Sequence, residues 1–143
     1  MGYDPIKITE ETTWNSEANK NVYAISKYEA EMEVWRGVQE GVPCVIVNPG
    51  VILGPGFFRS GSGGLFKRVY KGLGYATNGV TGYVGVLDVV KGMTSLMNSD
   101  CQNERFIMVA ENLSFLDVTT LISNGFKLVP PKKIARKWML AFA

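Results

Sequence analysis

Tyr23 and Lys27 are the residues of this 143-residue chain best suited to transfer a proton. They stand four positions apart in a stretch that reads as a helix, so their side chains share one helix face. The positive charge of a neighbouring lysine favours the phenolate over the phenol, which makes the hydroxyl a usable general acid or base. The chain contains no histidine, so this pair is its leading candidate for proton transfer.

The spacing alone is weak evidence, because Tyr3 and Lys7 repeat it. Pro5 lies between those two residues and interrupts a helix, so they have no reason to share a face. No helix breaker follows Tyr23 until Gly37. From spacing alone, a packed tyrosine and a surface lysine would still be the better explanation. The elements that follow the pair decide between the two.

Those elements predict an α/β domain. A helix is expected over about 21–41, with Tyr28, Met32 and Trp35 as an apolar stripe, most of its charges on the other side, and Gly41 as a left-handed cap. The apolar run 44–47 predicts a strand covered on both faces, as in a parallel sheet. Strands are further expected over 82–86 and 105–110, and helices over about 65–70, 88–97, 114–124 (opened by a Ser114–Asp117 capping box and closed by Gly125) and 132–142.

Composition excludes several classes of protein. Hydrophobic content of 46% and charged content of 20% are those of a globular domain, and a net charge of +2 gives no case for nucleic acid or an anionic membrane. No apolar run is long enough to span a bilayer. Cys44 and Cys101 lack the spacing of a metal knuckle and read as reduced thiols, so we expect a cytoplasmic protein without a metal site.

The order of these features resembles one family. A Tyr-x-x-x-Lys helix is followed by a buried strand and then by Asn48-Pro49-Gly50-Val51-Ile52-Leu53-Gly54-Pro55-Gly56. The run 22–56 resembles the extended short-chain dehydrogenase/reductase family, also called the NAD-dependent epimerase/dehydratase family. The segment after the strand is most similar to the dihydroflavonol-reductase-like branch. A softer resemblance continues through 82–90 and 104–107.

This resemblance implies a site for NAD or NADP and assigns the residues to roles. The matching tyrosine, Tyr23, exchanges the substrate's proton while hydride passes to or from the nicotinamide. The matching lysine, Lys27, holds the nicotinamide ribose hydroxyls and makes the tyrosine more acidic. The segment that the resemblance places beside the nicotinamide, with its backbone near the carboxamide, consists of Pro49, Gly50, Val51 and Ile52. A plain strand-to-loop turn is the alternative for Pro49 and Gly50.

The chain also departs from the family pattern. The family's glycine-rich dinucleotide turn has no match, since Gly61-Ser62-Gly63-Gly64 has the wrong spacing; the stretch from Ser60 to Gly64 reads as a surface loop or a lid. In the family, the serine or threonine that holds the substrate lies on a strand before the tyrosine helix, whereas the residues before that helix read as a loop here. We therefore expect the C-terminal portion of a Rossmann-type doubly wound sheet plus part of the small substrate-binding region. Residues 1–56 are assigned to the dinucleotide-binding domain, and 57–143 to a mixed substrate-side region.

The expected function is that of a piece of an NAD(P)-dependent reductase acting on a small-molecule carbonyl, with a homodimer through the Tyr23–Lys27 helix as a further prediction. Two alternatives stay open. One is a nucleotide-sugar epimerase or dehydratase of the same fold, which needs the same tyrosine. The other is a non-catalytic binding module that keeps the fold and scaffolds a partner. By itself the 143-residue piece is expected to be inactive and to bind dinucleotide weakly.

Overall fold

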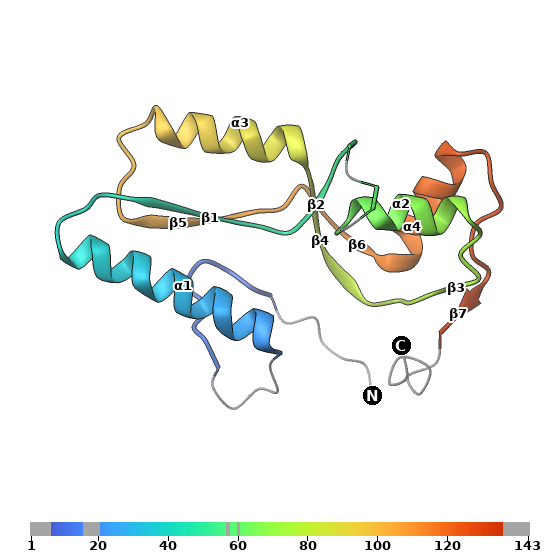
Figure 1. Cartoon of the computed structure of the whole chain (residues 1–143), viewed down its shortest axis with the longest axis horizontal. Helices are drawn as coiled ribbons and strands as arrows, with labels where there is room; N and C mark the ends of the chain where they lie inside the picture. The colour runs from blue at the N-terminus through green and yellow to red at the C-terminus, as the bar shows by residue number, and fades with distance from the viewer. Residues whose placement is uncertain (1–6, 16–20, 57, 60, 136–143) are drawn as a thin grey trace. The chain divides into compact units, whose positions relative to one another are not determined.

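A computed structural model describes residues 7–15, 21–56, 58–59 and 61–135 (Figure 1). Tyr3 and most of the helix expected over 132–142 lie outside these residues, and Lys133–Ile134 forms a short strand, β7. Contacts divide the chain into two compact units. Unit 1 comprises Met1–Asn48 and Met93–Ile107, and unit 2 comprises Pro49–Gly92 and Met108–Ala143. The boundary expected at residue 56 stays a prediction.

Unit 1 contains helix α1 (Val22–Gln39) and most of strands β1 (Val45–Pro49) and β5 (Glu104–Met108). Asn21 caps α1 by accepting a 2.8 Å hydrogen bond from the Ala24 N–H. After the helix, Gly41 has a φ of 92°, which confirms the expected left-handed residue. Strand β1 pairs with β5.

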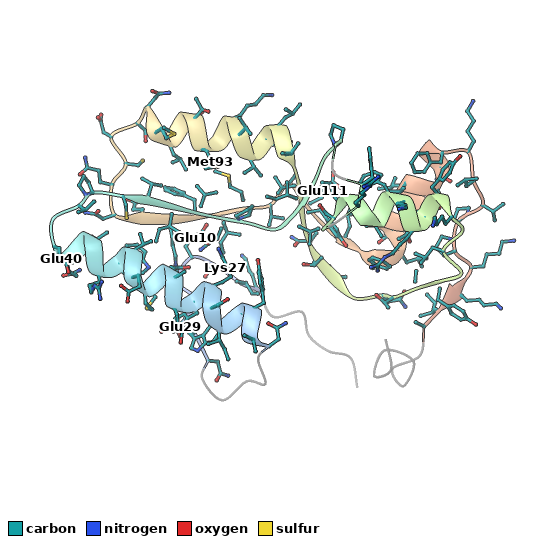
Figure 2. The ribbon with its side chains drawn as sticks, viewed as in Figure 1. Glu10, Lys27, Glu29, Glu40, Met93 and Glu111 are labelled. Atoms are coloured by element: carbon teal, nitrogen blue, oxygen red, sulfur yellow. The ribbon has the colours of Figure 1, made fainter. Side chains whose placement is uncertain are left out.

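Strand β1 has neighbours on both faces, as its unbroken apolar run predicted. Ile46 lines a pocket with residues of α1, whereas Val45 lines another with Leu96 of helix α3 (Val86–Met97). Alternate residues of a strand point to opposite faces, so α1 covers one face and the C-terminal turns of α3 the other. Met93 points from α3 toward the strand pair (Figure 2).

The predicted apolar stripe of α1 is partly wrong. Ala24, Tyr28, Glu31 and Trp35 are half-buried, whereas Met32 is 37% exposed. These four follow the 3.6-residue helical repeat, and Met32 lies about a quarter turn away from them. A glutamate therefore occupies the inner face where a methionine was expected. Glu29 projects from the side of α1 away from β1, as predicted (Figure 2).

Unit 2 is built on a three-stranded sheet in the order β2-β4-β6. β2 (Val51–Leu53) pairs in parallel with β4 (Val80–Gly85), and β6 (Glu111–Ser114) pairs with β4 in antiparallel fashion. Helices α2 (Gly63–Tyr70) and α4 (Phe115–Gly125) contact each other, and β3 (Tyr75–Ala76) pairs in parallel with β7. The buried core consists of Val69, Tyr83, Val118 and Ile122.

The capping box that opens α4 is confirmed. The Asp117 N–H donates to Ser114 Oγ at 3.0 Å, and the Ser114 N–H donates to the Asp117 carboxylate at 3.2 Å. The predicted end of this helix is confirmed to within one residue, because α4 ends at Gly125. Gly125 does not have the expected left-handed conformation, and the residue with positive φ is Lys127, at 59°. Strands β2, β3, β6 and β7 were not predicted, whereas α2, α3, β4 and β5 were, with bounds shifted by a few residues.

Candidate active site

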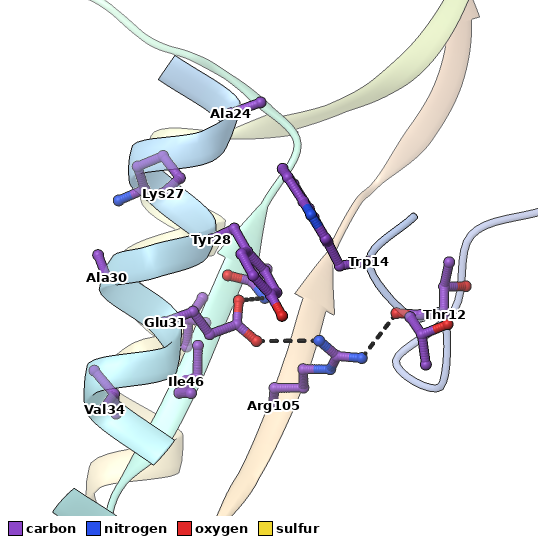
Figure 3. Close-up of a pocket in the computed structure, with 13 residues that line it drawn as sticks. Thr12, Trp14, Ala24, Lys27, Tyr28, Ala30, Glu31, Val34, Ile46 and Arg105 are labelled. Carbon is purple, nitrogen blue, oxygen red and sulfur yellow. Dashed lines mark hydrogen bonds and ion pairs between the residues drawn. The ribbon is translucent and has the colours of Figure 1, made fainter. Parts of the chain in front are cut away.

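Tyr23 and Lys27 lie one turn apart on α1, in unit 1. The Tyr23 side chain is 72% exposed, so its ring contributes little to packing. Lys27 contributes to the lining of a pocket of about 430 Å³ in the same unit, and its amine points away from Tyr28 and Arg105 (Figure 3). Tyr23 is not among the residues that line this pocket. The helix thus places the two residues one turn apart, as the spacing predicted, and only Lys27 lines the pocket.

The other expected site residues form the junction of β1 and β2, which falls in unit 2. Pro49 ends β1, Gly50 separates the strands, and Val51 and Ile52 belong to β2. Val51 and Ile52 are therefore strand residues paired with β4, where a segment beyond the strand was expected. The carbonyl of Ile52 accepts a hydrogen bond from the hydroxyl of Ser62.

Gly50 has a packing reason to be glycine. A Cβ built at this position would lie 2.5 Å from the carbonyl oxygen of Gly82 in β4. Its N–H donates a 3.0 Å hydrogen bond to the Met108 carbonyl, which holds the junction in place. The protein's own backbone therefore fills the space that the missing side chain leaves, and close approach of a ligand is not needed to explain this glycine.

The pocket beside Lys27 is formed by α1, β1, Arg105 of β5 and the segment that precedes α1 (Figure 3). Its walls combine an aromatic pair, aliphatic side chains and one ion pair. The lining residues are Thr12, Thr13, Trp14, Ala24, Lys27, Tyr28, Ala30, Glu31, Val34, Ile46, Val47, Asn48 and Arg105.

Glu31 and Arg105 form the ion pair of this pocket. Arg105 Nη1 lies 3.0 Å from Glu31 Oε1, and the two side chains are 28% and 17% exposed. Glu31 also accepts hydrogen bonds from the Trp35 indole and the Asn48 amide, each at 3.3 Å. Partial burial raises the pKa of the Glu31 carboxyl, but the hydrogen bonds from Arg105, Trp35 and Asn48 outweigh it, so the pKa lies below its ordinary value of 4.5.

A second carboxylate, Glu10, fastens the segment before α1 to β5. It accepts a 2.9 Å hydrogen bond from the Ile107 N–H. That bond, aided by the charge of Arg105, holds the pKa of Glu10 below its ordinary value. Trp14, four residues further on, stacks on Tyr28 with ring centroids 4.3 Å apart and planes 12° apart. The segment thus supplies one aromatic face of the pocket.

Sequence reasoning missed Glu10, Trp14, Glu31 and Arg105. Two signals were available: Glu31 falls on the stripe defined by Tyr28 and Trp35, and Arg105 is a charged residue at the start of an otherwise apolar predicted strand. Neither signal identifies its partner, because 74 positions separate Glu31 from Arg105. Across the described residues, no group of three or more metal-binding side chains comes together, and no described helix is long and apolar enough to cross a membrane.

Comparisons with known proteins relate this geometry to a fold. None of the curated proteins matches the chain in sequence. A nucleoside-diphosphate-sugar epimerase from Pseudomonas aeruginosa has a TM-score of 0.83 and 19% identity, over 94% of this chain and 45% of that one. A dTDP-glucose 4,6-dehydratase from Bacillus anthracis, solved with NAD, has a TM-score of 0.74 and 16% identity, over 94% and 44%. A UDP-glucose 4-epimerase from Thermotoga maritima, solved with UDP-glucose, has a TM-score of 0.62 and 23% identity, over 80% and 41%.

The chain spans less than half the length of each of these structures. The likeness establishes the fold, and the expected Rossmann-type α/β class is confirmed. The expected extended short-chain dehydrogenase/reductase family is confirmed as well, without distinction of the dihydroflavonol-reductase-like branch. A sequence profile of the family described as "Male sterility protein" matches residues 1–123, most of the chain. The chain therefore belongs to the male sterility protein family, an NAD-binding family of the extended short-chain dehydrogenase/reductase type.

Proposed function

We propose that the chain carries the catalytic helix of an NAD(P)-dependent oxidoreductase that reduces a small-molecule carbonyl. The observation that supports this proposal is the placement of Tyr23 and Lys27 one turn apart on α1, in a chain of an NAD-binding family. Helix α1 leads directly to β1 and the glycine junction at Gly50, which is the order that the family pattern requires.

In this proposal Tyr23 is the proton donor. Its ring is largely exposed, so the hydroxyl is accessible to a substrate oxygen without rearrangement of a core. Lys27 has two functions: its amine binds the ribose hydroxyls of the nicotinamide, and its charge stabilises the phenolate that remains once the proton has been transferred. The bound nicotinamide supplies the hydride. The backbone of Pro49, Gly50, Val51 and Ile52 is the proposed contact for the carboxamide.

The residues present are chemically suited to bind the nicotinamide ribose of such a cofactor. A lysine amine and a tyrosine hydroxyl on one helix face are suitable donors for a ribose diol. The junction at Gly50 gives no independent support, since Gly82 occupies the space beside it. The assignment of the cofactor-binding role therefore depends chiefly on Tyr23 and Lys27.

A nucleotide-sugar epimerase or dehydratase is the second candidate function. It is favoured by the three similar structures described above, which are named as enzymes of these two kinds. Both functions use a tyrosine at the position of Tyr23. They differ in the fate of the cofactor, because reduction of a carbonyl consumes NADH or NADPH, whereas epimerisation and dehydration regenerate the cofactor within each turnover.

Replacement of the proposed proton donor tests the proposal. In the protein that contains this chain, Tyr23→Phe should abolish turnover of carbonyl substrates, whereas the affinity for NADPH or NADH should fall only slightly, because Lys27 still binds the ribose hydroxyls. Tyr70→Phe is the matched control, because Tyr70 is 67% exposed and lies in unit 2, in edge-on contact with Phe126. Wild-type turnover in Tyr23→Phe would show that the donor is another group. Turnover of sugar nucleotides without net loss of cofactor would favour the epimerase or dehydratase, and no turnover with either panel would favour a scaffold.

The 143-residue chain offers a separate test. Its sequence contains no glycine-rich dinucleotide turn, so titration with NADH or NADPH should give no saturable change in nicotinamide fluorescence. Saturable binding at micromolar concentration would contradict this expectation.

A further inference from the structure

The segment before α1 is held in place by Arg105. Within the segment, the Thr12 N–H donates to the Thr9 carbonyl and the Thr9 N–H donates to Thr12 Oγ1, both at 2.9 Å. Arg105 Nε donates to the Glu10 carbonyl at 2.7 Å, and Nη2 donates to the same carbonyl and, at 3.0 Å, to that of Thr12. Nη1 donates to Glu31 of α1. One side chain of β5 therefore ties the segment to the helix.

These contacts need an arginine. The planar guanidinium group donates from all three of its nitrogens, Nε and Nη2 toward the segment and Nη1 toward α1, which no other side chain can do. The pair with Glu31 is also better shielded from water than a surface pair. Arg36 of α1 forms ion pairs with Glu33 and Glu40, yet its side chain is 68% exposed, so these two pairs contribute little to stability. Arg105 and Arg36 thus offer a matched comparison within one unit.

The two elements that Arg105 connects, the segment before α1 and α1 itself, each contribute one ring of the aromatic pair. Trp14 follows Thr12 by two residues, and Tyr28 precedes Glu31 by three on the inner face of α1. The hydrogen bonds that hold Thr12 and Glu31 therefore also hold the backbone on which the two rings are mounted. Trp14, Tyr28 and Lys27 all line the same pocket, so the stacked rings form part of its wall beside Lys27.

We propose that Arg105 is a positioning residue, which holds Trp14 against Tyr28 and so preforms the aromatic wall of the pocket beside Lys27 before any ligand binds. Preformation lowers the entropic cost of binding, because the rings and the segment need not be ordered by the ligand. The assignment goes beyond the proposed reaction and does not depend on it, since none of the contacts involves Tyr23.

Fluorine NMR of the 143-residue chain labelled with 5-fluorotryptophan tests the proposal without any activity. The chain has 3 tryptophans, and loss of one resonance in Trp14→Phe identifies Trp14. In Arg105→Met the folded-state resonance of Trp14 should move toward the position seen in the unfolded chain. Arg105→Lys should move it in the same direction, because one ammonium group cannot reach the Glu10 and Thr12 carbonyls and Glu31 together. Arg36→Met should leave it unmoved.

The same spectra separate positioning from general stability. A purely structural role would increase the population of unfolded chain, which gives separate resonances, without moving the folded Trp14 resonance. An unmoved folded resonance in Arg105→Met, a wild-type position in Arg105→Lys, or an equal displacement in Arg36→Met would each overturn the proposal. If Arg105→Met does not fold, Glu31→Gln probes the tie from the helix side while preserving size, and an unmoved Trp14 resonance in that variant would overturn it as well.

Discussion

Gly50→Ala tests whether the glycine of the β1–β2 junction serves packing. The added Cβ would lie 2.5 Å from the Gly82 oxygen and 2.8 Å from the Gly82 carbonyl carbon, where real Cβ contacts are essentially never below 3.0 Å. β2 or β4 must therefore shift by about 0.5 Å at this contact. Overpacking of this kind costs about 1–3 kcal/mol. Because both close atoms belong to a paired strand and cannot rotate away, we expect a loss of about 2–3 kcal/mol.

Urea unfolding without any nucleotide measures this loss. Gly64→Ala is the control in the same unit, because a Cβ at Gly64 in α2 meets nothing within 4 Å. Alanine in place of glycine in a helix adds up to ~1 kcal/mol, so the control should unfold at equal or higher urea concentration. A free energy of unfolding for Gly50→Ala within about 0.5 kcal/mol of wild type would refute the packing explanation. Loss of cofactor affinity in that stable variant, measured in the protein that contains this chain, would instead assign Gly50 to the ligand.

Three further expectations concern α4, the ion pair of unit 1 and the assembly of α1. Ser114→Ala should lower the free energy of unfolding by about 1 kcal/mol through loss of the capping box, whereas Ser95→Ala on the exposed side of α3 should not lower it. The pKa of Glu31 is lowered in the folded state, so the stability that its carboxylate contributes is complete above the ordinary pKa of 4.5 and is lost as the pH falls through the lower value. In urea unfolding, acid should therefore lower the stability of the wild type more than that of Glu31→Gln. Glu10, whose pKa is also lowered, and Arg105 are present in both proteins and affect both. A homodimer through α1 should appear in analytical ultracentrifugation and be weakened by Ile25→Glu, because that side chain is 40% exposed; an unchanged monomer–dimer distribution in the variant would place the contact elsewhere.

The elements that the sequence predicted well are those whose signals are local. Helix α1 has a long run without a breaker and a glycine just after its end, and both signals lie within the helix or next to it. Strands β2, β3 and β7 are two or three residues long, too short for any periodicity to appear. Gly125 was expected to end α4 because glycine favours a left-handed cap, yet Lys127 adopts that conformation at a steric cost that its surroundings must offset.

The candidate site shows the same division between local and distant information. Tyr23 and Lys27 could be proposed as a pair because any helix at this position places them on one face, one turn apart. The partner of Glu31 could not, since a charged residue on an inner helix face demands an opposite charge but does not say which one. Arg105 meets that demand only because β5 pairs with β1 beside α1, a property of the assembled unit. A contact between distant parts of the chain is therefore found from the folded unit, whereas two residues on one face of a helix can be proposed as a pair from the sequence.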